Sequence, residues 1–280
     1  MTRDNAPGLH RGSTPPRRRQ PARSPRALDP RLVGIAVVVM LLALPAVAGA
    51  QPSADELLVA AENSVFPDSF VATVVLTTTE DGEVASQMEL EISYRHETGS
   101  YMEVVAPARS RGLRFLQIEE TLWMYNPRAG GGRAIRLSPR SSFQGSAFSN
   151  RDLSDPEFAD DYDVRIDGSE EIEHPELGTV ACWVLEATAT DDSLAYARIR
   201  IWVTEETRYF VRAEYYAKSG LLFKSSVLRG IEQLAGARRP TIIEMRNRQQ
   251  EGLVSTMEIT EMEIADDLPD RVFTQRHLTR

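Results

Sequence analysis

The sequence is poor in the residues that most often build metal or redox sites. It contains one cysteine and four histidines in 280 residues. Cys182 can form no internal disulfide, and its place in the apolar segment VACWVLEA indicates a small buried side chain rather than a reactive thiol. The histidines, at positions 10, 96, 174 and 277, stand singly, without a second His or Cys at metal-ligand spacing. We therefore expect no metal, no cofactor and no enzymatic activity.

The sequence also lacks an apolar run long enough for a comfortable membrane span. Its one long run, residues 32–44, has 13 residues, whereas a span needs roughly 20. Arg31 precedes the run, and the small residues Ala48-Gly49-Ala50 follow it, which is typical of a secretory signal peptide cleaved near position 50/51. Residues 1–50 would then be an Arg/Pro-rich disordered leader plus this signal peptide, and residues 51–280 one exported, periplasmic domain. An uncleaved N-terminal anchor is the alternative.

Basic side chains are scarce in the exported part. Residues 1–50 hold eight of the 32 Lys and Arg residues but two of the 41 Asp and Glu residues, so 24 basic and 39 acidic side chains remain, a net charge of about −15. Like charge opposes the approach of nucleic acid or of an anionic membrane surface. We therefore expect no nucleic-acid partner, and only transient membrane contact.

The periodicity of residues 51–280 predicts one helix followed by many strands. Ser53 and Glu56 have capping-box spacing, and an apolar stripe follows until Pro67. After that, short alternating or apolar segments are separated by turn signals, which favours a mostly antiparallel meander of about 10–11 strands, enough to curl into a barrel-like sheet. The expected strands are SFVATVVLTTT, SQMELEISYR, YMEVVAP, LRFLQIEE, TLWMYNP, RAIRLS, DYDVRIDG, TVACWVLEAT, ARIRIWVT, YFVRAEYYA, LLFKSSVLRGI, TIIEMRN and VSTMEITEMEI.

The segment SFQGSAFS, residues 142–149, has two interpretations. A serine nucleophile at Ser146 would need a base within reach and commonly a G-x-S-x-G turn, but here Gly145-Ser146 is followed by Ala147-Phe148. The alternative is a loop whose two phenylalanines, Phe143 and Phe148, press onto an apolar surface as a lid or as an ordinary packed loop. We favour the second interpretation.

Several motifs together resemble a known family. The segments LWMYNPR, RLSPRSSFQGSAFSNRDL, DYDV, WVLEAT, IRIWVTEET, RAEYYAKSG and LPDRVFTQRHL are similar to those of the bacterial outer membrane lipoprotein-sorting proteins, the LolA-like group. The resemblance covers residues 53–280 and is most specific between Leu122 and Leu153 and at the C-terminus. It implies a mainly β fold (α+β), an incomplete antiparallel β-barrel whose concave apolar face is covered by a helix and loops. It also implies a carrier of lipid or lipoprotein acyl chains, often linked to a membrane transporter of the resistance-nodulation-division (RND) type.

Placing this fold on the sequence gives candidate site residues. The candidates for the cavity wall are apolar strand residues: Leu90, Ile92, Phe115, Trp123, Tyr125, Trp183, Leu185 and Ile201. The candidates for the lid lie in the helix from Ala54 to Ala61 and the loop from Phe143 to Phe148: Leu57, Leu58, Ala61, Phe143 and Phe148. In some members of the family an arginine inside the cavity holds the lid shut. Arginines 95, 114, 198 and 200 all lie in expected strands, and the sequence does not assign this role to any one of them.

Two functions remain open, and a third, an enzyme, would need a catalytic site that the sequence does not show. The first is a periplasmic carrier that holds acyl chains in an apolar half-barrel and hands them between membranes or transporters. The alternative is a noncatalytic partner domain of an RND-type transporter without lipid cargo.

Overall fold

The computed structural model describes residues 51–119, 121–129, 132–154 and 161–280. The leader and signal peptide expected in residues 1–50 lie outside the described residues. The part from Pro52 to Arg280 forms one compact unit. Within the described residues, no helix combines the length and the apolar character needed to cross a membrane.

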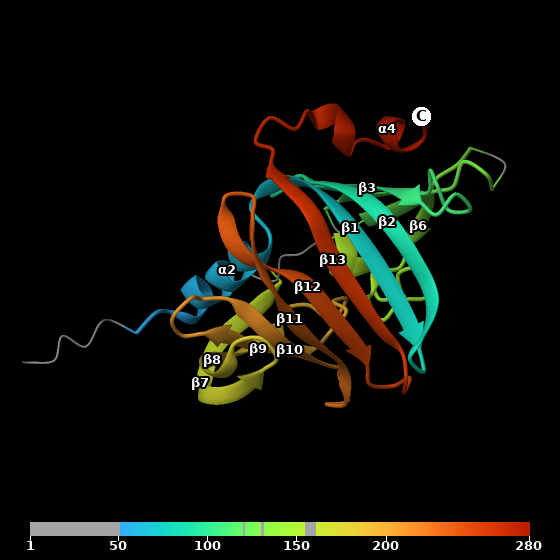
Figure 1. Ribbon diagram of the computed structural model, residues 1–280. Helices are drawn as coiled ribbons and strands as arrows, with labels where there is room; N and C mark the ends of the chain where they lie inside the picture. Colours follow the sequence, from blue (N-terminus) through green and yellow to red (C-terminus); the bar gives the residue numbers. More distant parts are fainter. Residues whose placement is uncertain (1–50, 120, 130–131, 155–160) are drawn as a thin grey trace, which may run out of the picture. The chain divides into compact units, whose positions relative to one another are not determined.

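The unit is built around one antiparallel sheet of 13 strands (Figure 1). All 13 segments with strand patterns, including the short β4 to β6, pair in it, so the fold class is confirmed, and the sheet has 13 strands where about 10–11 were expected. The strands are β1 (Ser69–Glu80), β2 (Glu83–Arg95), β3 (Gly99–Ala106), β4 (Arg114–Ile118), β5 (Thr121–Tyr125), β6 (Ile135–Leu137), β7 (Tyr162–His174), β8 (Gly178–Ala189), β9 (Arg198–Thr204), β10 (Phe210–Tyr216), β11 (Leu222–Leu234), β12 (Ala237–Asn247) and β13 (Val254–Ile264).

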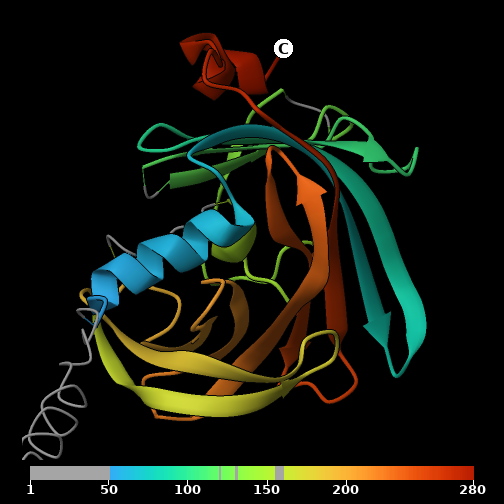
Figure 2. The same ribbon diagram turned by 60° about the vertical axis from the view of Figure 1, so that its left-hand side comes forward.

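The strand order leaves the barrel open. It runs β6-β5-β4-β3-β2-β1-β13-β12-β11-β10-β9-β8-β7. Strands β1 and β13, the first and last in the sequence, are therefore neighbours, and the two edge strands β6 and β7 do not pair with each other in the described sheet. The chain reaches the far edge of the sheet through the connection that contains helix α3 (Asn150–Ser154). The sheet curls around one concave side (Figure 2), in keeping with an open half-barrel.

Register brings apolar side chains onto this concave side. One row crosses four strands through Leu185, Ile201, Ala213 and Ser226, and β1 and β2 place Val74 opposite Leu90. Because side chains alternate along a strand, the intervening residues point outward. The concave residues form one continuous core that takes in strands from both halves of the sheet.

Helix α2 (Ala54–Val65) lies across the concave side of the sheet (Figure 2). It begins as predicted: the Ser53 hydroxyl accepts from the Glu56 amide at 3.1 Å, and the Glu56 carboxylate accepts from the Ser53 amide at 2.9 Å. Its apolar stripe, Leu57, Leu58, Ala61 and Val65, is buried in the core of the sheet. The helix is therefore held by burial of one face more than by its own propensity.

The outer face of the sheet carries two smaller apolar clusters. The 3-10 helix η1 (Asp270–Phe273) and helix α4 (Gln275–Leu278) cover one of them, in which Phe273 and Leu278 pack with Tyr101 and Leu116 (Figure 1). The other contains Cys182, which is fully buried beside Val184, Trp202 and Val211, as the sequence predicted. Burial raises the pKa of the Cys182 thiol to about 11, so the thiol stays protonated at neutral pH.

One turn glycine is required by a close backbone approach. Gly99 has φ +132°, and a Cβ placed there would lie 2.0 Å from the Gln117 carbonyl oxygen. We expect Gly99→Ala to lower the free energy of unfolding by about 3 kcal/mol, since backbone strain and overlap add. Gly82→Ala, at φ +86° with nothing within 4 Å, is the control and costs about 1 kcal/mol. If urea denaturation gave the same loss of unfolding free energy for both variants, the close approach of the Gln117 carbonyl to residue 99 would be contradicted.

Candidate functional site

The concave face is closed by α2 and by the loop of residues 142–149. Phe143 and Phe148 of the loop are fully buried in the same core as α2, and the Phe143 ring packs against Phe115 with 4.7 Å between centroids. The Phe143 amide donates to the Phe148 carbonyl at 2.9 Å, and the Ala147 amide donates to Ser255 Oγ of β13 at 2.9 Å. The loop is therefore a compact plug anchored to the sheet.

The geometry around Ser146 does not resemble an activated nucleophile. The side chain is buried, and its hydroxyl donates to the Phe148 carbonyl at 3.4 Å. His174, the histidine that lies buried, contacts the Leu228 carbonyl at 2.8 Å instead. A nucleophilic serine requires a base within hydrogen-bond reach, whereas the Ser146 contact stabilises the turn of the plug.

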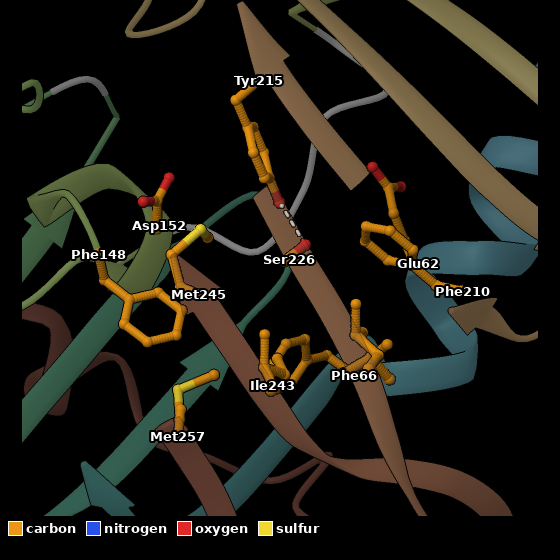
Figure 3. A pocket seen from close by; sticks show the side chains of 12 residues that line it. Glu62, Phe66, Phe148, Asp152, Phe210, Tyr215, Ser226, Ile243, Met245 and Met257 are labelled. Atoms are coloured by element: carbon orange, nitrogen blue, oxygen red, sulfur yellow. Dashed lines mark hydrogen bonds between the residues drawn. The ribbon is translucent and has the colours of Figure 1, made fainter. Parts of the chain in front are cut away.

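A small cavity remains between α2, the plug and strands β10 to β13 (Figure 3). Its volume is about 50 Å³, well below the roughly 300–1,000 Å³ of sites that hold small-molecule ligands. This cavity is thus closed, and an acyl chain can enter it only if a covering element moves. The lining residues are Glu62, Val65, Phe66, Phe148, Asp152, Phe210, Tyr215, Ser226, Leu228, Ile243, Met245 and Met257.

The structure brings six of the eight expected wall residues to the concave core. These are Leu90, Ile92, Phe115, Trp183, Leu185 and Ile201. Trp123 and Tyr125 instead pack in the outer cluster beneath the C-terminal segment, because their register places them on the opposite face from Met124 and Phe115. The five lid candidates Leu57, Leu58, Ala61, Phe143 and Phe148 all meet in the concave core, and Phe148 lines the cavity.

The wall of the cavity itself comes from β10 to β13, which the sequence analysis did not select. Alternation in these strands carried a signal: Ser226 and Leu228 are two residues apart, as are Ile243 and Met245. The signal was ambiguous because Val227, between Ser226 and Leu228, and Ile242, directly before Ile243, are also apolar. Only the pairing across strands fixes which residues face inward.

A buried polar cluster adjoins the cavity. Lys224 Nζ lies 3.3 Å from Asp152 Oδ2 and donates to the Tyr196 hydroxyl at 3.0 Å. The Tyr196 hydroxyl in turn lies 2.8 Å and 2.9 Å from the two Asp152 carboxylate oxygens. Nearby, the hydroxyls of Tyr215 and Ser226 are 3.3 Å apart (Figure 3). Burial raises the pKa values of Tyr196 and Tyr215 well above their usual range, so both are neutral hydrogen-bond donors at physiological pH.

The four strand arginines considered from the sequence all form ion pairs with acidic side chains. They join partly exposed carboxylates: Arg95 with Asp270, Arg114 with Glu103, Arg198 with Glu186, and Arg200 with Glu170. Arg200 also lies over the outward-facing Trp202 ring. No described group of three or more His, Cys, Asp and Glu side chains has the arrangement of a metal site.

The arginine that contacts the covering helix is Arg239 of β12. Its side chain is buried and donates to the Val65 carbonyl at 3.1 Å and the Asn63 carbonyl at 3.4 Å, at the C-terminal end of α2. The last turn of α2 has no basic residue of its own. Arg239 therefore supplies, from the sheet, the positive charge that a helix C-terminus favours.

Loss of this anchor should loosen α2. We expect Arg239→Met to lower the free energy of unfolding by about 2 kcal/mol, because hydrogen bonds from a charged group are lost, and to speed amide hydrogen exchange in α2 before the sheet is affected. The neighbouring exposed Arg238→Met is the matched control. Unchanged exchange in α2 for Arg239→Met would contradict the anchoring role.

Comparisons with known proteins agree with this architecture. A protein-family model described as "Uncharacterized protein" matches residues 96–280, most of the chain. The chain belongs to this family. No curated protein matches it in sequence. Its fold is LolA-like: a LolA superfamily protein from Nitrosomonas europaea is 28% identical with a TM-score of 0.73, over 81% of this chain and 100% of that one.

Two further solved structures share the LolA-like fold. A DUF1329 family protein from Desulfovibrio piger is 21% identical with a TM-score of 0.70, over 80% of this chain and 97% of that one. A domain from Vibrio parahaemolyticus described as an outer membrane lipoprotein-sorting protein is 20% identical with a TM-score of 0.68, over 81% and 98%. The resemblance inferred from the sequence motifs is thus confirmed, and these two structures establish the fold alone.

Proposed function

We propose that this protein is a noncatalytic periplasmic carrier that holds the acyl chain of a lipid or lipoprotein on the concave face of its open sheet. The observation that carries the proposal is the closure of an apolar concave face by two separate elements, α2 and the 142–149 plug, around a cavity of about 50 Å³. Displacing either element would expose an apolar channel without breaking the strand ladder. The LolA-like fold supports the same proposal.

The energetics favour such a carrier. Moving a 16-carbon chain from a membrane into water costs on the order of 12 kcal/mol, at about 0.8 kcal/mol per methylene. An apolar protein surface offsets most of this cost. In the absence of cargo, α2 and the plug bury the same apolar surface, and with cargo bound they close over the chain instead. After release to an acceptor, α2 and the plug return to this surface.

Native mass spectrometry tests the proposal most directly. The protein would be produced from its full-length sequence in an exporting bacterial cell, purified from the periplasm without detergent, and extracted to identify co-purifying molecules. We expect a stoichiometric lipid or acylated peptide. Phe148→Ser should retain less of it, because the variant presents a hydroxyl where the plug covers the chain, whereas Leu221→Ser, at an exposed site, should retain the wild-type amount.

The opposite outcome is equally informative. If the purified protein carries no lipid and does not bind added lipids, the carrier proposal is overturned. The remaining candidate would then be a partner domain of an RND-type transporter, and the protein would next be tested for binding to such a transporter.

A further inference from the structure

The buried Lys224–Asp152 pair joins β11, whose Ser226 and Leu228 line the cavity, to one of the covers of the cavity. Lys224 lies on β11, where its register partner is Tyr215, on the same concave row as Ile199 and Ala187. Asp152 lies on α3, directly after the plug, and lines the cavity (Figure 3). Their side chains are 5% and 8% exposed, so the pair is shielded from water. A basic side chain of β11, next to the cavity, is therefore neutralised by an acid of the cover.

Two hydrogen bonds with Ser149, at the end of the plug, fix the position of Asp152. Ser149 caps α3: its amide donates to Asp152 Oδ2 at 2.7 Å, and its hydroxyl accepts from the Asp152 amide at 3.2 Å. The second cover, α2, also brings an acid to the cavity, because Glu62 is among the lining residues. Both covers thus carry a carboxylate at the cavity, while the sheet strand β11 carries the ammonium of Lys224 beside it.

Opening of the cover has an electrostatic consequence. If the plug and α3 move away with Asp152, the buried Lys224 beside the apolar core loses its counter-charge, which is strongly unfavourable. An acidic group brought in by the ligand would restore the pair. Lys224 Nζ and the hydroxyl of Tyr196 are donors of the kind that bind a carboxylate or phosphate through charge-assisted hydrogen bonds. A ligand with a neutral head would leave the ammonium uncompensated.

We propose that Lys224 and Tyr196 form a head-group subsite, and that the cargo is an anionic acyl amphiphile whose carboxylate or phosphate replaces Asp152 when the cover opens. This inference rests on the proposed carrier function and names its ligand class. The acid of the cover acts as an internal competitor for the subsite, so binding of an anionic lipid and opening of the cover are linked.

Matched ligands separate the head group from the chain. The protein, produced from its full-length sequence, purified from the periplasm and delipidated, would be titrated with palmitate and with hexadecanol. The two ligands share a 16-carbon chain but differ in charge. The wild-type protein should prefer palmitate by about tenfold or more, since hydrogen bonds from a charged donor are involved. A second pair, dipalmitoyl phosphatidate and dipalmitoylglycerol, distinguishes a phosphate head from a carboxylate head.

Variants of the pair supply the decisive readout. Lys224→Met should reduce palmitate binding to the level of hexadecanol and leave hexadecanol binding unchanged, whereas Lys224→Arg should keep the preference. Asp152→Asn, which removes the competing charge, should strengthen palmitate binding several-fold. A purely structural pair would shift both ligands together. If Lys224→Met fails to fold, the double variant Asp152→Leu with Lys224→Met, which removes both charges, replaces it.

The outcomes separate this inference from the carrier function. Equal affinity of the wild-type protein for palmitate and hexadecanol, or a preference that survives Lys224→Met, would overturn the head-group subsite and leave the carrier intact. Failure to bind any of the four ligands would overturn both.

Discussion

Asp152→Ala is expected to lower the free energy of unfolding by about 3–5 kcal/mol, because it leaves the buried ammonium of Lys224 without a counter-charge. The substitution also removes an acceptor of the Tyr196 hydroxyl and of the Ser149 amide. Urea denaturation, followed by the signal of the three tryptophans, measures the change.

Two comparisons show whether the loss comes from the unpaired charge. The double variant Asp152→Leu with Lys224→Met should recover most of the lost stability, since replacing a buried ion pair by apolar side chains is often close to neutral. Asp192→Ala, which removes an exposed partner of Lys218, should leave the denaturation midpoint unchanged. A small loss for Asp152→Ala, or no recovery in the double variant, would mean that the pair is hydrated in solution.

Phe143→Ala is expected to lower the free energy of unfolding by about 3–5 kcal/mol, the usual cost of truncating a buried phenylalanine. The Phe143 ring is fully buried, and it packs against Phe115 of β4. The measurement distinguishes a plug that is seated in the core from a plug that is open. If the plug is seated in the core in most molecules, as in the structure, the full cost is observed.

The matched control is Leu221→Ala, at an exposed leucine directly before β11, for which we expect a change within about 0.5 kcal/mol. A cost below about 1 kcal/mol for Phe143→Ala would show that the plug is open for much of the time. The protein would then populate the open form without cargo, and the closed form would be a minority state.

The fold was largely predictable because its strands show alternating or apolar patterns and are separated by strong turn signals. The N-terminal helix was also predictable, since Ser53 and Glu56 lie three residues apart and form both hydrogen bonds of the capping box. The segment RAIRLS was expected as a strand, but in the structure only its three residues Ile135–Leu137 form strand β6 at the edge of the sheet.

The candidate site was predictable only in part. Alternation correctly grouped Trp183 with Leu185, but it could not decide which face of β5 turns inward, so Trp123 and Tyr125 were assigned to the cavity although they pack beneath the C-terminal segment. Lys224 and Arg239 were not identified, because a lone basic residue in a strand is most often on the solvent face.

The sequence by itself determined the elements of this protein: its capped helix, its antiparallel strands, the apolar character of the plug and its likeness to LolA-like proteins. These are local properties, fixed by spacings of two to four residues. The tertiary structure alone decided which faces meet, since the sheet brings Asp152 to Lys224 across 72 positions and Arg239 to Val65 across 174. A sequence period defines two faces of a strand, but only the pairing and curvature of the whole sheet determine which of them encloses the cavity.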